Sequence, residues 1–379
     1  MTGGPARNLT PRMPVSANSL SWRASGEIFF PARADGGFAV YSLDPGATRL
    51  TKLWSGAETL RSFAVARSVD ITTGVFSSFR SPPEVRAGSL GAWKALTSVN
   101  AEARPFWGEA KSLHWQSGGA RVQGWLLPPP NLDPSKRYPM VVVVHGGPAG
   151  AADADWPSRW PATLPSQGYF VFLPNPRGSF GFGEAFAEAN VKDFGGGDLA
   201  DILAGVDEVL KVAPVDPRRL GITGWSYGGY MAMWAVTQTD RFAAAVAGAG
   251  IASWQSYYGQ NKIDTWMLPF FGASVYDDPK VYAKSSPIEF IRKAKTPTLV
   301  LHGERDSEVP TPQGYEFWHA LKTLGVPTRL VIYADEGHSI TRPENKRDIV
   351  KRSAAWFDEY LGSDPRSGSD PNSPRSSSP

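Results

Sequence analysis

One short segment constrains the fold of this chain more than any other, because residues 224–230 have the sequence GWSYGGY. A short apolar run precedes this segment at 219–223, and a helix-forming run without proline follows it at 230–236. Small residues on both sides of a serine let the backbone turn sharply from a strand into a helix. The segment therefore predicts a strand, a strained turn with Ser226 at its apex, and a helix.

An acid and a histidine follow Ser226 at the ends of two further expected strands. Residues 298–303 and 329–333 have the apolar pattern of buried strands, and they lead into Asp306 and His338, respectively. Side chains at the carboxyl ends of parallel strands meet in one crevice of a doubly wound sheet. The chain order Ser, Asp, His is that of the α/β-hydrolase fold. We therefore expect Ser226 to be a nucleophile, His338 its general base, and Asp306 the group that orients the imidazole.

Other histidines and acids of the chain are alternatives for the last two roles. The histidines lie within expected strands or a helix rather than at strand ends, which favours structural roles for His114, His302 and His319. The alternative acids are Glu304, Asp335 and Glu336. Asp335 and Glu336 are too close to His338 along the chain to orient its ring from the opposite side. Glu304 remains an alternative to Asp306.

A second glycine-rich turn follows an early apolar strand at 140–144, and it has the sequence HGGP at 145–148. In the α/β-hydrolase fold, one donor to the reaction's oxyanion is the backbone N–H after the nucleophile, here that of Tyr227. The other donor comes from a glycine-rich turn of this kind, and we expect it to be Gly147. The alternative is a plain strand-to-loop turn in which His145 is a hydrogen-bonded edge histidine.

Five motifs between Leu113 and Leu361 together resemble the prolyl oligopeptidase family of serine peptidases. In chain order they are HGGP at 145–148, NPRGSFGFG at 175–183, GWSYGGY at 224–230, HGERDSEVP at 302–310 and EGH at 336–338. The HGGP turn is more similar to the acylaminoacyl peptidases and bacterial dipeptidyl aminopeptidases than to prolyl oligopeptidase itself. The resemblance implies hydrolysis of short peptides through an acyl-enzyme, with no metal and no cofactor.

An aromatic insertion at 254–271 follows an expected core strand, and its position predicts that it covers the cleft. By resemblance, Trp254 and Tyr257 match positions that line the pocket for the residue before the scissile bond. Packing within the core is the alternative for both side chains, because an aromatic run is more often core than pocket.

A helix is expected at 199–210, where apolar residues recur on one face, with Asp198 as its cap. Arg177 lies upstream in the NPRGS motif. Its side chain either binds the substrate or pairs with Asp193 or Asp198 and holds the loop.

The N-terminal quarter has a different pattern, with short alternating runs separated by turn residues from Asn18 to Asn100. The runs repeat weakly at about 44 residues, which is typical of β-propeller blades with four strands each. Two blades cannot close a ring that needs at least four. The family resemblance implies a propeller that caps the α/β-hydrolase domain. We therefore expect this cap to be incomplete, with exposed strand edges that allow the chain to form homo-oligomers.

These patterns divide the chain into four expected segments. Residues 1–17 are a disordered N-terminus, 18–105 a partial β-propeller of about two blades, and 106–362 an α/β-hydrolase peptidase domain with a doubly wound sheet. The last segment, 363–379, consists of polar residues, glycine and proline without apolar side chains, which predicts a disordered tail.

Composition excludes several classes of function. The net charge is only +3 and no block of Lys or Arg occurs, so neither nucleic acid nor a membrane surface is an expected partner. No run approaches the ~18 apolar residues of a membrane span, and residues 1–20 lack the apolar core of a signal peptide. The absence of cysteine excludes disulfides, thiolate metal sites and a cysteine nucleophile. The expected compartment is the cytoplasm.

The sequence therefore predicts a serine peptidase that acts on short peptides. Two alternatives remain open. A carboxylesterase could use the same triad, since esters form an acyl-enzyme at least as readily as amides do. A non-catalytic binding scaffold could keep the fold without the reaction.

Overall fold

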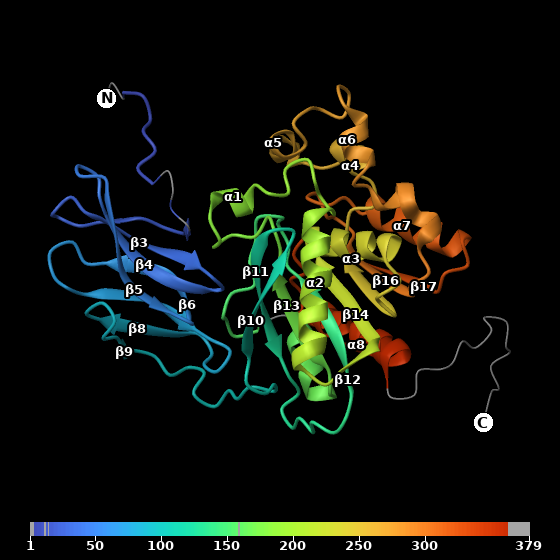
Figure 1. Ribbon diagram of the computed structural model, residues 1–379, viewed down its shortest axis with the longest axis horizontal. Helices are drawn as coiled ribbons and strands as arrows, with labels where there is room; N and C mark the ends of the chain where they lie inside the picture. The colour runs from blue at the N-terminus through green and yellow to red at the C-terminus, as the bar shows by residue number, and fades with distance from the viewer. Residues whose placement is uncertain (1–3, 11–12, 14, 158–159, 363–379) are drawn as a thin grey trace.

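A computed structural model describes residues 4–10, 13, 15–157 and 160–362 of the chain. Its largest element is an eight-stranded sheet in the order β10-β11-β13-β12-β14-β15-β16-β17 (Figure 1). Strand β11 pairs antiparallel with both β10 and β13, and the six strands from β13 to β17 in this order run parallel to one another. The strands are β10 (Lys111–Ser117), β11 (Ala120–Leu127), β12 (Tyr138–Val144), β13 (Phe170–Asn175), β14 (Val215–Trp225), β15 (Ala244–Gly248), β16 (Thr298–Gly303) and β17 (Thr328–Tyr333).

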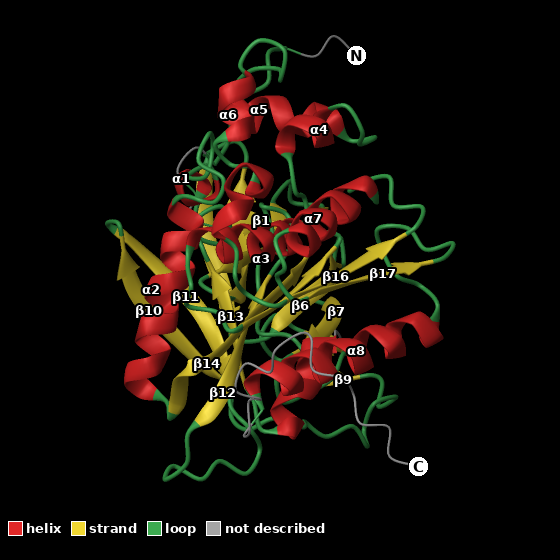
Figure 2. Cartoon of the chain, turned by 90° about the vertical axis from the view of Figure 1, so that its right-hand side faces the viewer, coloured by secondary structure: helices red, strands yellow, loops and turns green. Residues whose placement is uncertain are grey.

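Helices cover both faces of this sheet because its central strands are apolar on both sides (Figure 2). Along β12, for example, Met140 and Val142 face one core and Val141 faces the other. The first core is closed by α2 (Gly197–Val212), α3 (Tyr227–Gln238) and α7 (Pro312–Thr323), and the second by η1 (Trp160–Gln167) and α8 (Pro343–Leu361). The predicted α/β class with a doubly wound sheet is confirmed.

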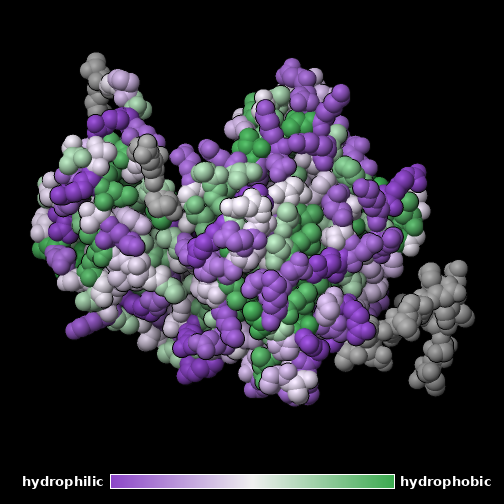
Figure 3. Space-filling model, viewed as in Figure 1, coloured by the Kyte–Doolittle hydropathy of each residue, from purple (hydrophilic) through white to green (hydrophobic). Residues whose placement is uncertain are grey.

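The aromatic insertion between β15 and β16 forms a group of short helices above one end of the sheet (Figure 2). These helices are α4 (Trp254–Tyr258), η2 (Asp264–Trp266), α5 (Met267–Phe271), α6 (Pro279–Ala283) and η3 (Pro287–Lys293), and a further short helix, α1 (Glu184–Ala187), follows β13. In the space-filling view, this group and the N-terminal part rise on either side of a notch (Figure 3). The insertion therefore lies where the sequence placed it, over the sheet.

The N-terminal part forms two antiparallel sheets that do not close into a ring within the described residues. One contains β1 (Ser16–Ala17), β2 (Ser21–Trp22), β3 (Ile28–Ala34), β4 (Gly37–Asp44) and β5 (Arg49–Gly56), and the other β6 (Thr59–Val65), β7 (Thr72–Ser77), β8 (Glu84–Gly88) and β9 (Lys94–Ala95). Phe38 and Val40 of the first sheet pack against Leu60 and Phe76 of the second. The predicted all-β segment is confirmed, and its boundary near residue 105 stays a prediction.

Two expected disordered segments have different outcomes. Strand β1 lies within the first 17 residues, where Ser16 and Ala17 pair with Arg33 and Ala32 of β3, so this stretch contains a short ordered strand. A strand of two residues is too short to produce a recognisable pattern. The expected tail at 363–379 lies outside the described residues.

No helix among the described residues has both the length and the apolar character needed to cross a bilayer.

Candidate active site

The GWSYGGY segment forms the expected strand, turn and helix. Strand β14 ends at Trp225, helix α3 begins at Tyr227, and Ser226 between them has φ 62° and ψ −122°. This backbone conformation is strained for a residue with a side chain. Two glycines let α3 approach the sheet, since a Cβ at Gly228 or Gly229 would clash with a carbonyl oxygen of a neighbouring strand or of its end. Local sequence therefore places Ser226 at the carboxyl end of β14.

Asp306 and His338 contact each other directly. The Nδ1 atom of His338 lies 2.7 Å from Oδ2 of Asp306. The carboxylate of Asp306 is fully buried, and its other oxygen accepts hydrogen bonds from the backbone N–H groups of Glu308 and Val309, at 3.0 and 2.9 Å. The indole of Trp225, next to Ser226, donates to the backbone carbonyl of His338 at 2.8 Å. With Nδ1 facing Asp306, Nε2 of His338 is the atom left to exchange a proton with a serine.

The alternative acids have other partners. Glu304 accepts a hydrogen bond from the backbone N–H of Asp335, and the carboxylate of Asp335 pairs with Arg305 and Arg342. Within the described part of the chain, neither carboxylate forms a hydrogen bond or an ion pair with the ring of His338. The geometry therefore pairs His338 with Asp306, while the catalytic roles of both residues stay predictions.

Glu336, the third alternative acid, anchors the loop that carries His338. Its carboxylate accepts hydrogen bonds from Asn345, from the backbone and side chain of Thr341, and from the backbone of Arg342, all at 2.8–2.9 Å. Burial alone would raise the pKa of Glu336, but these four donors outweigh it and lower the pKa to about 2. Glu336 therefore fixes the loop that carries His338.

The other histidines lie in structural positions. His302 is fully buried, and its Nε2 donates to the carbonyl of Val309 at 2.7 Å. Burial lowers the pKa of His302, which favours its neutral form. Through the carbonyl of Val309, this ring supports the loop that carries Asp306. His114 pairs with Asp35 of the N-terminal sheets, and His319 stacks on Trp318 of α7. None of these three lines the cavity beside Ser226.

The HGGP turn lies beside Ser226. Gly147 and the residue after the nucleophile, Tyr227, line the same cavity as Ser226. Gly147 has φ +136°, a conformation that L side chains rarely adopt. The ring of His145 is held within this region by the carbonyl of Gly146 and by the hydroxyl of Ser179, each at 2.8 Å. The histidine is thus a hydrogen-bonded support, and the proposed oxyanion donors remain Gly147 and Tyr227.

The expectation that Asp198 caps α2 is wrong. The helix begins at Gly197, and its first N–H donates to Oδ2 of Asp193 at 2.9 Å. Asp198 lies inside the first turn, where its buried carboxylate accepts a hydrogen bond from the hydroxyl of Tyr227 at 2.5 Å. Burial raises the pKa of Asp198 to about 6. Its carboxylate therefore accepts hydrogen bonds both from the side chain next to Ser226 and, at 2.9 Å, from the backbone N–H of Leu199.

Arg177 pairs with a residue that the sequence did not suggest. Its guanidinium makes a two-pronged contact with the buried carboxylate of Asp201, with Nε–Oδ2 at 2.9 Å and Nη2–Oδ1 at 2.7 Å. The expected partners Asp193 and Asp198 are therefore wrong, because the register of α2 turns Asp201 toward the loop. Arg177 does not line the cavity beside Ser226, so the structure places it in the loop-holding role.

A cavity of about 260 Å³ opens beside Ser226. Trp254 and Tyr257 form part of its wall, and both are also packed into the core at 0% and 1% exposure. Each of these two side chains therefore packs into the core and also faces the cavity. The full lining is Gly147, Ser226, Tyr227, Ile251, Trp254, Tyr257, Ile263, Trp266, Glu308 and Val309.

The sequence did not single out Glu308 or Trp266 as pocket residues. The only available signal for Glu308 was its position in the HGERDSEVP motif, two residues after Asp306. Among the described residues, no group of three or more His, Cys, Asp or Glu side chains is arranged to hold a metal ion.

Comparisons with known proteins agree on one family. Residues 156–364 match the family model described as the prolyl oligopeptidase family. The chain is 37% identical over 251 residues to an uncharacterized peptidase of Bacillus subtilis. This match covers 64% of this chain and 38% of the relative. It is 28% identical to dipeptidyl-peptidase 5 of Porphyromonas gingivalis over 94% of this chain and 54% of that protein. The chain thus spans 38% to 54% of the length of these relatives.

A solved structure has the same arrangement. The acylaminoacyl peptidase of Pyrococcus horikoshii superimposes with a TM-score of 0.84 at 27% sequence identity. The match covers 95% of this chain and 58% of that one, so it includes the N-terminal sheets as well as the large sheet.

Proposed function

Because the chain belongs to the prolyl oligopeptidase family, we propose that it is a serine peptidase that cleaves short peptides through an acyl-enzyme on Ser226. One observation carries the proposal: the 2.7 Å contact between His338 and Asp306, with the backbone of His338 hydrogen-bonded to Trp225, the residue before Ser226. The names of the relatives support acylaminoacyl and dipeptidyl peptidase activities as the two substrate classes to test.

The reaction would follow from the positions of these groups. The Ser226 hydroxyl oxygen attacks the peptide carbonyl carbon while its proton passes to Nε2 of His338. The buried carboxylate of Asp306 stabilises the imidazolium that forms, and the N–H groups of Gly147 and Tyr227 stabilise the oxyanion. The C–N bond then breaks as His338 returns the proton to the leaving amine. Water repeats these steps on the ester and releases the acid.

The cavity supports a preference for an apolar residue before the scissile bond. Its walls are mainly aromatic and aliphatic, and its volume of about 260 Å³ is small for a whole ligand and suits one large side chain. We therefore expect peptides with phenylalanine or leucine at this position to be cleaved faster than those with glycine or aspartate.

The test compares an amide with its matched ester while an active-site label reports on the serine. Acetyl-alanyl-phenylalanine p-nitroanilide and the corresponding p-nitrophenyl ester have the same acyl group. A peptidase hydrolyses both and is inactivated by a fluorophosphonate. Hydrolysis of the ester alone would identify a carboxylesterase, and the absence of both hydrolysis and labelling would identify a non-catalytic scaffold.

A further inference from the structure

Glu308 is the one charged side chain among the described residues that line the cavity beside Ser226. Its Oε2 atom lies 3.8 Å from Nε2 of His338, the nitrogen that faces away from Asp306. The other side chains of the cavity wall are uncharged, and their polar groups are the hydroxyls of Ser226, Tyr227 and Tyr257 and the indole N–H groups of Trp254 and Trp266. The cavity therefore has a single negative charge beside the atoms that would carry out the reaction.

The backbone around Glu308 is fixed, while its carboxylate has unused hydrogen-bonding capacity. The N–H of Glu308 donates to Asp306, and the carbonyl of the preceding residue, Ser307, accepts from the N–H of Lys262 at 3.0 Å. The side chain is 54% exposed, and within the described part of the chain no Lys or Arg forms an ion pair with it. A carboxylate accepts several hydrogen bonds, so Glu308 can bind a cation that arrives with a ligand.

We propose that the Glu308 carboxylate is a subsite for a cationic group of the substrate, an ammonium or guanidinium that lies next to the scissile bond. This inference rests on the proposed peptidase function. A cation within hydrogen-bonding distance of Glu308 lies beside His338, because the carboxylate is 3.8 Å from the ring. A hydrogen bond between two charged groups is roughly twice as strong as one between neutral groups, so the carboxylate distinguishes a cation from its neutral analogue.

Two parts of a peptide can supply this cation. One is the free amino group of a short peptide whose N-terminus lies close to the scissile bond. The other is a lysine or arginine side chain. The chemistry of recognition is the same, so matched substrate pairs must distinguish the two sources.

A second effect of Glu308 must be separated from recognition. A carboxylate close to the imidazole also stabilises the imidazolium that forms in the reaction, and this effect is the same for every substrate. Substrate recognition changes the ratio of rates between a cationic substrate and its neutral analogue. The ratio of two kcat/KM values therefore reports on the subsite alone.

The experiment uses two pairs of p-nitroanilides. Alanyl-phenylalanine and its N-acetyl derivative differ in the amino group, whereas acetyl-alanyl-lysine and acetyl-alanyl-norleucine differ in the side-chain charge. We expect the wild-type chain to favour the cationic member of at least one pair by about ten- to a hundredfold in kcat/KM. Glu308→Gln should abolish that preference, and Glu308→Lys should reverse it.

A matched control removes the same charge elsewhere. Glu344 is exposed in the first turn of α8 and does not line the cavity, so Glu344→Gln should keep the wild-type ratios. Equal ratios in wild type and Glu308→Gln, or no preference in wild type for either pair, would overturn the subsite while hydrolysis of the neutral substrates still supports a peptidase. Absence of hydrolysis of all four substrates, together with no fluorophosphonate labelling, would instead overturn the proposed function.

Discussion

The eight-stranded sheet and the two N-terminal sheets bury their apolar side chains in different ways. Parallel strands β12 to β17 are covered by helices on both faces, and two extensive clusters of buried residues lie on either side of them. The N-terminal sheets have two small clusters, and strand β5 is exposed along most of its length. The triad candidates all follow strands of the large sheet, namely β14, β16 and β17. The comparison indicates that the large sheet, which carries the triad candidates, has much more extensive packing than the N-terminal sheets.

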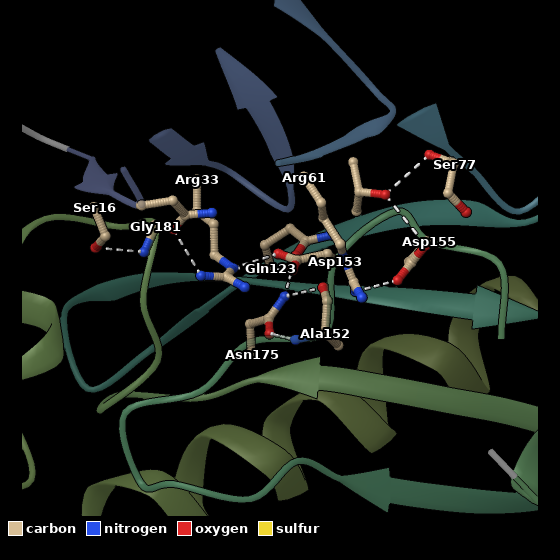
Figure 4. A network of polar contacts seen from close by, with 12 residues as sticks. Ser16, Arg33, Arg61, Ser77, Gln123, Ala152, Asp153, Asp155, Asn175 and Gly181 are labelled. Atoms are coloured by element: carbon tan, nitrogen blue, oxygen red, sulfur yellow. Dashed lines mark hydrogen bonds and ion pairs between the residues drawn. The ribbon is translucent and has the colours of Figure 1, made fainter. Parts of the chain in front are cut away.

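The two regions meet through polar contacts (Figure 4) and through Phe79, which follows β7 and packs against Trp125 of β11 in the second core. Arg33 of β3 pairs with the buried carboxylate of Asp153 at 2.9 Å, and Arg61 of β6 pairs with Asp155. Both acids belong to the loop that follows the HGGP turn, and Ala152 of this loop bonds to the side chain of Asn175. The N-terminal sheets therefore contact the part of the catalytic region closest to the proposed oxyanion donors.

The largest expected effect is the loss of activity when the hydroxyl of Ser226 is removed. Ser226→Ala should reduce kcat about a million-fold, because removing a triad nucleophile typically has this effect. Ser226 is at the apex of a partly exposed turn, so the thermal unfolding midpoint should change little. Activity measured on freshly purified variant checks the prediction, and retention of more than a few per cent would contradict the assignment.

A smaller loss is expected from the orienting acid. Asp306→Asn should reduce kcat about ten-thousand-fold, because an amide favours the wrong tautomer of His338. Glu304→Gln is the matched control, since Glu304 bonds to the backbone of Asp335 instead. A severe defect in Glu304→Gln with a mild one in Asp306→Asn would reverse the assignment.

Breaking the contact between the two regions should have a moderate effect. Arg33→Gln leaves the buried carboxylate of Asp153 without its cation, which should lower the free energy of unfolding by about 1–3 kcal/mol and kcat by about tenfold. Arg80→Gln removes an exposed ion pair with Glu109 and should change stability by less than about 0.5 kcal/mol. Urea unfolding and steady-state kinetics on both variants decide whether the N-terminal sheets support catalysis.

The anchor of the His338 loop predicts a pH-dependent difference. The pKa of Glu336 is about 2 in the folded state, below its ordinary value of 4.5, so between these values the unfolded state binds more protons. Its stabilising contribution is present above pH 4.5 and is lost as the pH falls toward 2. Glu336→Gln should be about 2 kcal/mol less stable than wild type at pH 7, and the difference should shrink in acid. Urea midpoints at pH 7, 4 and 3 measure it, and a constant difference would be inconsistent with this linkage.

The smallest expected effect is weak self-association through the N-terminal sheets. Strand β5 forms one edge of its sheet and exposes backbone groups that a second chain can pair with. Light scattering should show self-association with rising concentration, and Lys52→Thr, which removes an edge charge, should increase it. A strict monomer for both proteins at high concentration would show that this edge does not pair.

Sequence reasoning succeeded where a feature depends on neighbours along the chain. The strand, turn and helix around Ser226 follow from small residues and apolar periodicity, and the places of Asp306 and His338 follow from the ends of strands. It failed where a feature depends on packing between distant segments. The contact between Arg177 and Asp201 requires the rotation of α2 about its axis, which no local pattern specifies.

Two other features of the site show the same limit. Asp198 was expected to cap α2, but its carboxylate turns inward to Tyr227, a contact made only when two helices pack together. Glu308 belongs to a polar loop, and only the folded cavity places it beside Ser226. Side chains with a choice of partners are therefore the part of the site that a single sequence leaves open.

The central claim is that hydrolysis proceeds through a covalent acyl-enzyme on Ser226. The most direct measurement is rapid acid quenching during the first turnover of a reactive ester, followed by trypsin digestion and mass spectrometry. Residues 220–241 form one tryptic peptide that contains Ser226. The account predicts that this peptide gains the mass of the acyl group, with the modification on Ser226 and none in Ser226→Ala. Turnover without an adduct on this peptide, or an adduct on another residue, would contradict it.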